Sequence, residues 1–368
     1  MAGTKFNDTA GAATHPAVTN FFRGRSVLIT GAAGSIGSVV ARQVAALPVA
    51  RLLLLDRDEN SMFELLRSFN ESQSSALVEV ISTLGDIRDE GFVRHAFSRW
   101  RPEVVIHAAA YKHVPMMEEN PCEAVLNNVS GTRIVRDAAL KCACDRLLLI
   151  STDKAVEPVS VMGATKRTAE LLMQQSDASP RRAVRASVRF VNVTGSRGSV
   201  VPIFEEQIAR GGPVTVTHEQ MTRYFMRVED AARLLLEVAT LDGAGKIYAL
   251  ETGQPVSVMD LARGMIAEAG MVPDLDVKIK VTGARAGERL AERLHGVDES
   301  LAPTAFAGID EVWSSAKPIL DCGLLAQLET SARNRDARQV IELLGLLPIG
   351  YVPLGVETRA GDAVVANS

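Results

Sequence analysis

Asp153 and Lys154 are adjacent in the sequence and follow an apolar run that ends at Ser151 and Thr152. A carboxyl group and an amine at one place can exchange protons with a bound molecule, one as acid and the other as base. An exposed ion pair at a surface looks the same in a sequence. The spacing alone therefore leaves both interpretations open.

A glycine-rich segment near the N-terminus has the types and spacing that bind phosphate. Residues 30–37 read TGAAGSIG, between a predicted strand at 26–30 and a predicted helix at 36–47. Glycines at such a turn let a diphosphate approach the backbone, and free N–H groups at the start of the helix attract its charge. We therefore predict a dinucleotide cofactor, held by Gly31, Ala33, Gly34, Ser35, Ile36 and Gly37.

Asp56 ends the next predicted strand, 19 residues beyond Gly37. A carboxylate there binds the adenosine ribose and repels a 2′-phosphate, which favours NAD over NADP. Arg57 and Arg88 follow strand ends and could accept that phosphate, so NADP stays an alternative. Further cofactor contacts are expected at later strand ends, at Asp86, Ile87, Ala108, Ala109 and Ala110.

Met162 and Lys166 stand where short-chain dehydrogenases carry Tyr-x-x-x-Lys, with Met162 eleven residues beyond Ser151. One helical turn separates the two positions, so both should face the cofactor. Methionine cannot carry a proton. Either the protein is inactive, or Asp153 and Lys154 carry out the proton transfers.

These residues require a sheet that presents several strand ends at one edge. Apolar runs without polar alternation predict strands covered on both faces, hence an α/β fold with a Rossmann-type doubly wound parallel sheet and a smaller α/β lobe. The predicted strands are 26–30, 51–56, 76–82, 104–107, 146–151 and 184–193. We expect a disordered leader at 1–22, a dinucleotide-binding domain at 23–193 with returns near 225–260, a lobe mainly at 194–356, and a frayed tail at 357–368.

The composition argues against several other classes of protein. Hydrophobic residues are 47% and charged residues 23%, as in globular proteins, and the net charge of −4 argues against nucleic acid as the main partner. The longest apolar stretch, residues 343–356, is too short to span a membrane, and the N-terminus lacks the apolar core of a secretory signal. We therefore expect a cytoplasmic protein. The four cysteines do not justify a metal.

Several longer segments resemble one known family. They are residues 107–121, 127–132, 151–167, 188–226 and 283–290. Together they are similar to the UDP-N-acetylglucosamine 4,6-dehydratases, CapD-like polysaccharide-biosynthesis members of the extended short-chain dehydrogenase/reductase superfamily. The resemblance covers about residues 25–294. Glu157 stands in place of the usual asparagine and Val191 in place of a glycine, and residues 285–289 read RAGER for RPGEK.

The resemblance implies an internal oxidation and reduction. A hydride leaves carbon 4 of the sugar for a tightly bound NAD, water is lost from carbons 5 and 6, and the hydride returns to carbon 6, which regenerates the cofactor. It implies that Lys154 is the base at carbon 5 and Asp153 the acid, while Thr152 and Lys166 orient the carbon 4 hydroxyl and the nicotinamide ribose. Lys154 would then need a lowered pKa, and Asp153 would have to be held protonated. Methionine at position 162 implies retention at carbon 5.

The resemblance also implies a UDP-N-acetylglucosamine or related UDP-sugar substrate and a homo-oligomer. The residues expected to contact the substrate are Lys112, His113, Asn192, Arg197, Thr217, Arg223, Arg285 and Glu288. The alternatives are a 5,6-dehydratase, a 5-inverting dehydratase, a 4-epimerase, or an inactive protein that only binds NAD.

Overall fold

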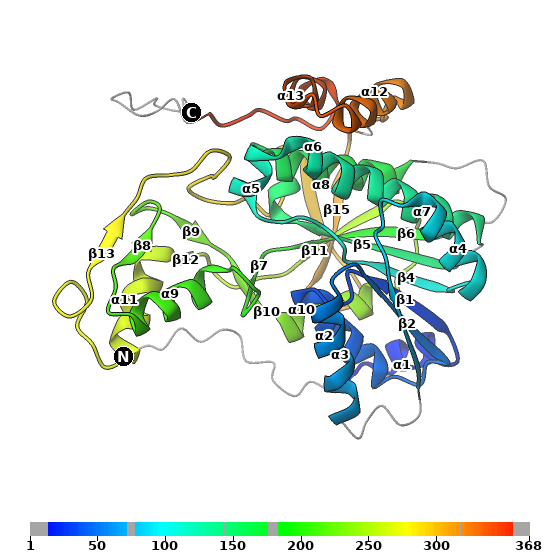
Figure 1. The fold of residues 1–368 in the computed structure, drawn as a ribbon, viewed down its shortest axis with the longest axis horizontal. Helices are drawn as coiled ribbons and strands as arrows, with labels where there is room; N and C mark the ends of the chain where they lie inside the picture. The colour runs from blue at the N-terminus through cyan, green and yellow to red at the C-terminus, as the bar shows by residue number, and fades with distance from the viewer. Residues whose placement is uncertain (1–13, 72–77, 143, 176–182, 317, 356–368) are drawn as a thin grey trace.

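The computed structural model describes residues 14–71, 78–142, 144–175, 183–316 and 318–355. Its centre is a nine-stranded sheet in the order β14-β15-β11-β6-β5-β4-β1-β2-β3 (Figure 1). The strands from β3 to β11 are parallel, and β15 and β14 are antiparallel at one edge. The strands are β1 (Ser26–Thr30), β2 (Arg51–Asp56), β3 (Glu79–Leu84), β4 (Val104–His107), β5 (Arg146–Thr152), β6 (Val184–Phe190), β11 (Lys246–Leu250), β14 (Glu299–Pro303) and β15 (Ile309–Ser314).

Both faces of the sheet are buried, which explains the apolar runs without alternation. Val27 and Ile29 of β1 face a core shared with α2 (Ser35–Ala45), whereas Leu28 faces the core on the other side. On the first face lie also α1 (Pro16–Phe22), α3 (Glu59–Glu71) and α10 (Val228–Val238). On the second lie α4 (Glu90–Trp100), α7 (Gly131–Lys141) and α8 (Val161–Gln174). The predicted doubly wound α/β fold is confirmed.

The predicted strand boundaries differ from the structure at three places. The strand predicted at 146–151 extends by one residue to Thr152. The strand predicted at 76–82 is observed at Glu79–Leu84, with residues 76–77 outside the described part of the chain. The strand predicted at 184–193 is two strands, because β7 (Asn192–Thr194) leaves the main sheet and pairs with β10 (Phe225–Arg227).

A smaller lobe lies to one side of the carboxyl edge of the sheet (left in Figure 1). Its core is a separate apolar cluster that includes Phe204, Ile208, Val214 and Ile266. Its elements are α9 (Val200–Ala209), β8 (Val214–Val216), β9 (Thr222–Arg223), β12 (Val256–Ser257), α11 (Val258–Glu268) and β13 (Ile279–Val281). Short strands pair within it, β8 with β13 and β9 with β12.

The expected disordered leader is wrong for residues 16–22, which form helix α1 (Pro16–Phe22). Pro16 begins the helix, at a position where a backbone N–H would have no intrahelical acceptor, so its missing N–H costs no hydrogen bond. Val18 and Phe22, one turn apart, are buried in the core beside α10. This apolar pair orders the segment. Residues 1–13 lie outside the described residues.

The C-terminal part of the chain also differs from the expected lobe at 194–356. Strands β14 and β15 extend the main sheet, and helices α12 (Cys322–Arg333) and α13 (Ala337–Leu346) pack on α6 (Pro121–Ala124) and the π-helical segment Val125–Ser130 (Figure 1, top). Leu328, Val340 and Leu344 are buried there, so these helices bury their apolar face against the part of the chain predicted to bind the dinucleotide. The tail expected at 357–368 lies outside the described residues.

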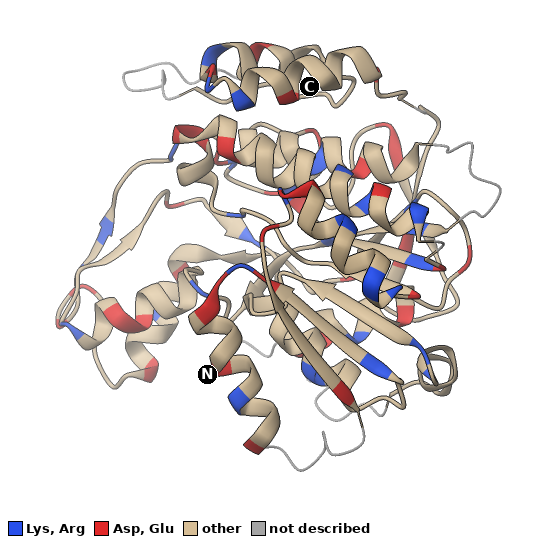
Figure 2. Cartoon of the chain, turned by 45° about the vertical axis from the view of Figure 1, so that its right-hand side comes forward, with Lys and Arg blue, Asp and Glu red and all other residues tan. Residues whose placement is uncertain are grey.

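Charged residues of both signs are interspersed along the helices, as the net charge suggests (Figure 2). Across the described ranges, none of the helices is long and apolar enough to span a membrane.

Candidate active site

The loop between β1 and α2 has a shape that only glycine permits at two positions. Gly31 has a φ of 66°, and a Cβ added there would lie 2.5 Å from the backbone nitrogen of Ala109. A Cβ on Gly37 would lie 2.1 Å from the carbonyl oxygen of Gly31. Asp56 completes the loop, since its Oδ2 accepts a hydrogen bond of 2.9 Å from the backbone N–H of Ala33. The loop therefore leaves room for a ligand to approach the backbone.

Two adjoining cavities of about 510 and 180 Å³ lie along this loop. The larger is lined by Gly31, Ala33, Gly34, Ser35, Ile36, Gly37, Asp56, Ala108 and Ala110 among others. The smaller adds Arg57, Asp86, Ile87 and Ala109. Every residue predicted from the sequence to contact the dinucleotide thus lines one of the two cavities, and the residues present fit such a cofactor.

Arg57 and Arg88, which kept NADP as an alternative to NAD, both form ion pairs with carboxylates. Arg88 pairs with Asp86 at 2.7 Å and with Glu123 at 2.8 Å. Arg57 pairs with Asp86 at 3.5 Å, and its guanidinium lies 4.9 Å from the centre of the Tyr111 ring. Asp86 therefore offsets part of the positive charge beside the adenosine end of the cavity.

Strand β5 delivers Thr152, Asp153 and Lys154 to its carboxyl end, where residues 153–155 form a short 3₁₀ turn. Asp153 Oδ1 accepts hydrogen bonds from Thr152 Oγ1 at 2.8 Å and from Lys154 Nζ at 2.9 Å. Asp153 is only 2% exposed, and its Oδ2 is buried with no hydrogen-bond partner among the described residues. Lys154 lines the larger cavity and is 20% exposed, whereas Asp153 lies buried behind it and does not line the cavity, so the pair is not an exposed ion pair at a surface.

Lys154 Nζ has two further polar neighbours. Asn192 Oδ1 of β7 lies at 3.3 Å and Glu292 Oε1 at 3.6 Å. Burial alone lowers the pKa of Lys154, but the carboxylates of Asp153 and Glu292 outweigh it and hold the pKa above its ordinary value. The expected lowering of this pKa is therefore wrong for the structure as it stands.

Met162 and Lys166 lie on the first turns of α8, which is capped by the Ser160 hydroxyl. Both side chains line the larger cavity beside Thr152 and Lys154. Lys166 Nζ donates a hydrogen bond of 2.6 Å to the carbonyl oxygen of Ile150, and burial lowers the pKa of Lys166 to about 8. The predicted shared face of positions 162 and 166 is observed.

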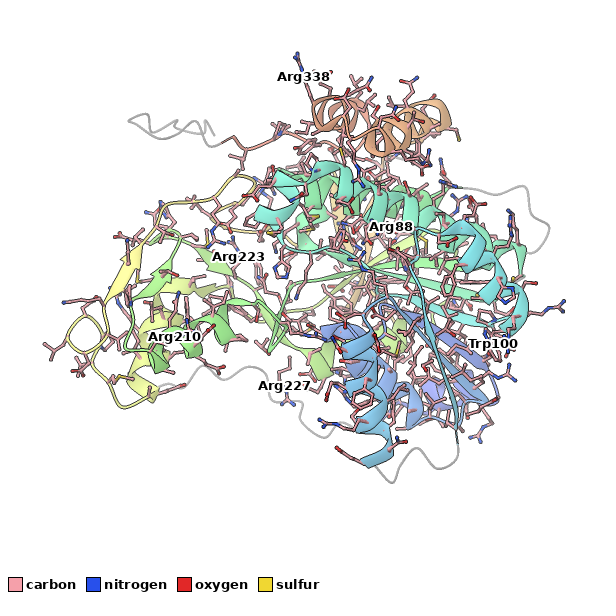
Figure 3. All side chains as sticks on the ribbon, viewed as in Figure 1. Arg88, Trp100, Arg210, Arg223, Arg227 and Arg338 are labelled. Carbon is pink, nitrogen blue, oxygen red and sulfur yellow. The ribbon has the colours of Figure 1, made fainter. Side chains whose placement is uncertain are left out.

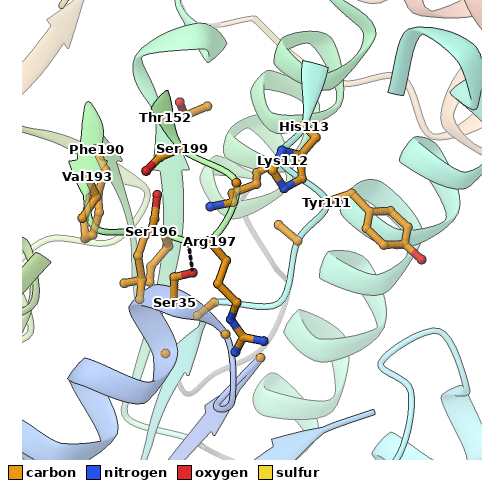
Figure 4. A pocket seen from close by; sticks show the side chains of 18 of the residues that line it. Ser35, Tyr111, Lys112, His113, Thr152, Phe190, Val193, Ser196, Arg197 and Ser199 are labelled. Carbon is orange, nitrogen blue, oxygen red and sulfur yellow. Dashed lines mark hydrogen bonds between the residues drawn. The ribbon is translucent and has the colours of Figure 1, made fainter. Parts of the chain in front are cut away.

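Four of the residues predicted to contact substrate line the larger cavity: Lys112, His113, Asn192 and Arg197. Figure 4 labels Lys112, His113 and Arg197 there. Burial lowers the pKa of Lys112, and Arg197 adds to that effect. Burial also lowers the pKa of His113, with a smaller contribution from Lys112. This side of the cavity thus carries closely spaced basic groups.

Arg197 lies against the glycine loop. Its guanidinium donates to the carbonyl oxygen of Ala33 at 2.7 Å and to Ser61 Oγ at 2.9 Å, and its backbone N–H donates to Ser35 Oγ at 3.0 Å (Figure 4). The structure therefore puts Arg197 beside the predicted diphosphate loop of the cofactor.

The other four predicted substrate residues, Thr217, Arg223, Arg285 and Glu288, do not line the larger cavity. Thr217 Oγ1 lies 3.0 Å from Met221 Sδ, and Arg285 is exposed. Arg223 donates to the carbonyl oxygens of Thr222 and Leu290 and lies between the lobe and the main sheet (Figure 3). Their direct contact with a substrate stays a prediction.

Glu292 is the main polar group at this site that the sequence argument missed. It lies two residues beyond the segment 283–290, in a region without regular secondary structure, so no periodicity marks it. Glu157, which stands in place of the family's usual asparagine, lies away from the larger cavity. Its carboxylate accepts from the Val297 N–H at 2.7 Å and pairs with Arg293, so it holds the 293–297 segment and does not line the larger cavity.

A doubly wound parallel sheet with this glycine loop, and a buried lysine one turn beyond Met162, define the extended short-chain dehydrogenase/reductase class. The chain belongs to the polysaccharide biosynthesis protein family, whose model matches residues 27–312, and is CapD-like within it.

Three proteins with similar sequences or structures support this family assignment. Capsular polysaccharide biosynthesis protein CapD of Staphylococcus aureus is 41% identical over 75% of this chain and 46% of its own length, so the chain spans about half of that relative. UDP-N-acetylglucosamine 4,6-dehydratase (inverting) of Campylobacter jejuni is 33% identical over 76% of this chain and 80% of that protein. The X-ray structure of Pen from Bacillus thuringiensis matches with a TM-score of 0.70 and 32% identity, covering 79% of this chain and 89% of that one.

Proposed function

We propose that the chain is a NAD-dependent UDP-N-acetylglucosamine 4,6-dehydratase that retains the configuration at carbon 5. The observation that carries this proposal is the contact of Lys154, which lines the larger cavity beside Met162, with the buried Asp153 behind it. An elimination needs an acid and a base at one place, and this contact supplies both. The similarity to the Campylobacter dehydratase supports the same class of substrate.

The residues of the cavity suit a bound nicotinamide cofactor, which when bound supplies a hydride acceptor. The glycine loop would hold its diphosphate and Asp56 its adenosine ribose. Lys166 would donate to the ribose next to the nicotinamide. Because Asp86 offsets Arg57 and Arg88, a 2′-phosphate gains little there, and we favour NAD over NADP.

A single proton shift gives Asp153 and Lys154 the protonation states that the reaction needs. In the resting state Lys154 carries its proton, because two carboxylates face it. Transfer of that proton to Asp153 Oδ1, across 2.9 Å, produces a neutral amine and a protonated carboxyl group. Lys154 then takes the proton from carbon 5, and Asp153 gives its proton to the departing carbon 6 hydroxyl. Water leaves, and the ion pair of the resting state is restored.

The test is incubation of the purified protein with UDP-N-acetylglucosamine in heavy water, followed by mass spectrometry and proton NMR. We expect loss of one water, a new 6-methyl signal, and deuterium at carbon 5 with the coupling of the retained configuration. Inverted coupling would favour a 5-inverting dehydratase. Loss of water without a methyl group would favour a 5,6-dehydratase, and a changed carbon 4 without loss of water a 4-epimerase. An unchanged substrate would contradict the proposal.

A further inference from the structure

We propose that Glu292 is a positioning residue for Lys154, which it holds in place and in its charged form from the opposite lobe. The consequence for turnover rests on the proposed function, since it assumes that Lys154 must lose its proton to act as base. The effect of Glu292 on the position and charge of Lys154 does not depend on the proposed function.

Glu292 reaches Lys154 from a segment anchored to the lobe. Ala291 forms a bridge with Thr222 of β9, and the Thr222 N–H donates to the carbonyl oxygen of Leu290 at 2.9 Å. Arg223 also donates to Leu290, at 3.1 Å. The backbone directly before Glu292 is thereby tied to β9, and the Glu292 carboxylate lies 3.6 Å from Lys154 Nζ, beyond the end of β5.

The charges around Lys154 alternate in sign. Asp153 lies on its own turn, Glu292 comes from the lobe segment, and Arg223 Nε lies 3.9 Å from Glu292 Oε1. Lys166 of α8 lines the same cavity. The side chains of Asp153, Glu292 and Arg223 are 2%, 5% and 11% exposed, so water screens them little. Within the described part of the chain, Glu292 forms ion pairs with Lys154 at 3.6 Å and with Arg223 at 3.9 Å, and it also interacts electrostatically with Arg289.

Removal of one of these charges should therefore change how readily Lys154 loses its proton. Loss of the Glu292 charge leaves only Asp153 to oppose the burial of the ammonium group, so more Lys154 becomes neutral at a given pH. Loss of the Arg223 charge should act in the opposite direction, because a neighbouring cation disappears.

The experiment measures the reactivity of Lys154 without relying on catalysis. The full chain, with and without added NAD, is treated with trace acetic anhydride at pH 9, and acetylation of Lys154 is compared by peptide mass spectrometry with that of exposed Lys280 in the same sample. Well below its pKa, an amine reacts in proportion to its neutral fraction. We expect Glu292→Gln to raise the relative rate by at least about fivefold, and Arg223→Gln to lower it severalfold.

Two control variants separate charge from packing. Glu292→Asp keeps the charge and shortens the side chain, so its rate should stay near that of the wild type. Glu268→Gln removes an exposed charge of the same lobe and should have no effect. Equal acceleration in Glu292→Asp and Glu292→Gln, or no acceleration in Glu292→Gln, would overturn the proposal. If Glu292→Gln does not fold, the opposite shift in Arg223→Gln and the unchanged rate in Glu292→Asp still decide it.

A second readout connects this effect to turnover. If the chain is a dehydratase, the acid limb of the kcat/KM profile should move to lower pH by about one unit in Glu292→Gln. A purely structural role would lower the rate without moving the limb. If the wild type does not convert UDP-sugars at all, the proposed function fails, while the acetylation result still reports on Glu292.

Discussion

The glycine loop and Lys154 of the Asp153–Lys154 cluster line the same cavity, but the loop and the cluster are held in different ways. The loop depends on backbone geometry within one short segment, with glycines where a Cβ would collide. The cluster depends on charged side chains from the turn after β5 and from the 290–294 segment, and on the Asn192 amide of β7. Binding should therefore be sensitive to small changes of volume in the loop, whereas chemistry should be sensitive to changes of charge in the cluster.

The largest effect should follow a change in the cluster. We expect Lys154→Met to lower turnover about a thousandfold, because the group that exchanges protons is gone, and to leave NAD affinity nearly unchanged. Steady-state kinetics and calorimetric titration with NAD would measure both. The control is Lys280→Met, an exposed lysine on β13, which should leave both values unchanged. Intact turnover in Lys154→Met would remove Lys154 from the mechanism.

The next effect concerns Glu170, a buried carboxylate that bonds Ser151, two residues before Asp153. Glu170 is buried and accepts from Ser151 Oγ at 2.7 Å and from Arg189 at 3.0 Å. Glu170→Gln leaves the buried Arg189 without one of its carboxylates and should lower the free energy of unfolding by roughly 3 kcal/mol. Urea denaturation would measure this. The exposed Glu342→Gln should cost less than about 0.5 kcal/mol, and an equal loss in both variants would contradict a special role for Glu170.

A change in the loop should affect binding first. In Gly37→Ala the added Cβ meets the Gly31 carbonyl oxygen, so the loop must open, and NAD affinity should fall about a hundredfold. Gly264→Ala is the matched control, because nothing lies within 4 Å of a Cβ at that helical position. Titration of both variants with NAD would decide it, and unchanged affinity in Gly37→Ala would refute the steric argument.

The smallest effect should appear in how the free energy of unfolding changes with pH because of Lys166, which lines the cavity between the loop and the cluster. Burial lowers the pKa of Lys166 to about 8 in the folded protein, against 10.5 as its ordinary value. The unfolded chain therefore binds more protons between these values, and stability should rise with pH there. Relative to Lys166→Met, the wild type should gain about 2 kcal/mol in free energy of unfolding from pH 8 to 9.5. Parallel urea curves for both proteins would show it, and a constant difference would contradict a depressed pKa.

Much of the nucleotide-binding half could be predicted from local patterns. The limits of β1, β2 and β4 agree with the prediction, because each strand is a short apolar run ended by glycine, an acid or a small residue. The loop residues were predictable for the same reason, since the steric demand on Gly31 and Gly37 acts within one segment. Helix α1 was missed because its order comes from contact of Val18 and Phe22 with a core formed elsewhere.

By itself, the sequence determined the parallel sheet, the glycine loop and the set of residues at the strand ends, since each depends on neighbours within a few positions. Only the tertiary structure decided that Glu292 faces Lys154, that Arg197 lies on the glycine loop, and that α12 and α13 cover the nucleotide-binding side. The physical reason is that charge acts through space. One of the two carboxylates that raise the pKa of Lys154, that of Glu292, lies 138 residues away in the sequence and 3.6 Å away in the fold.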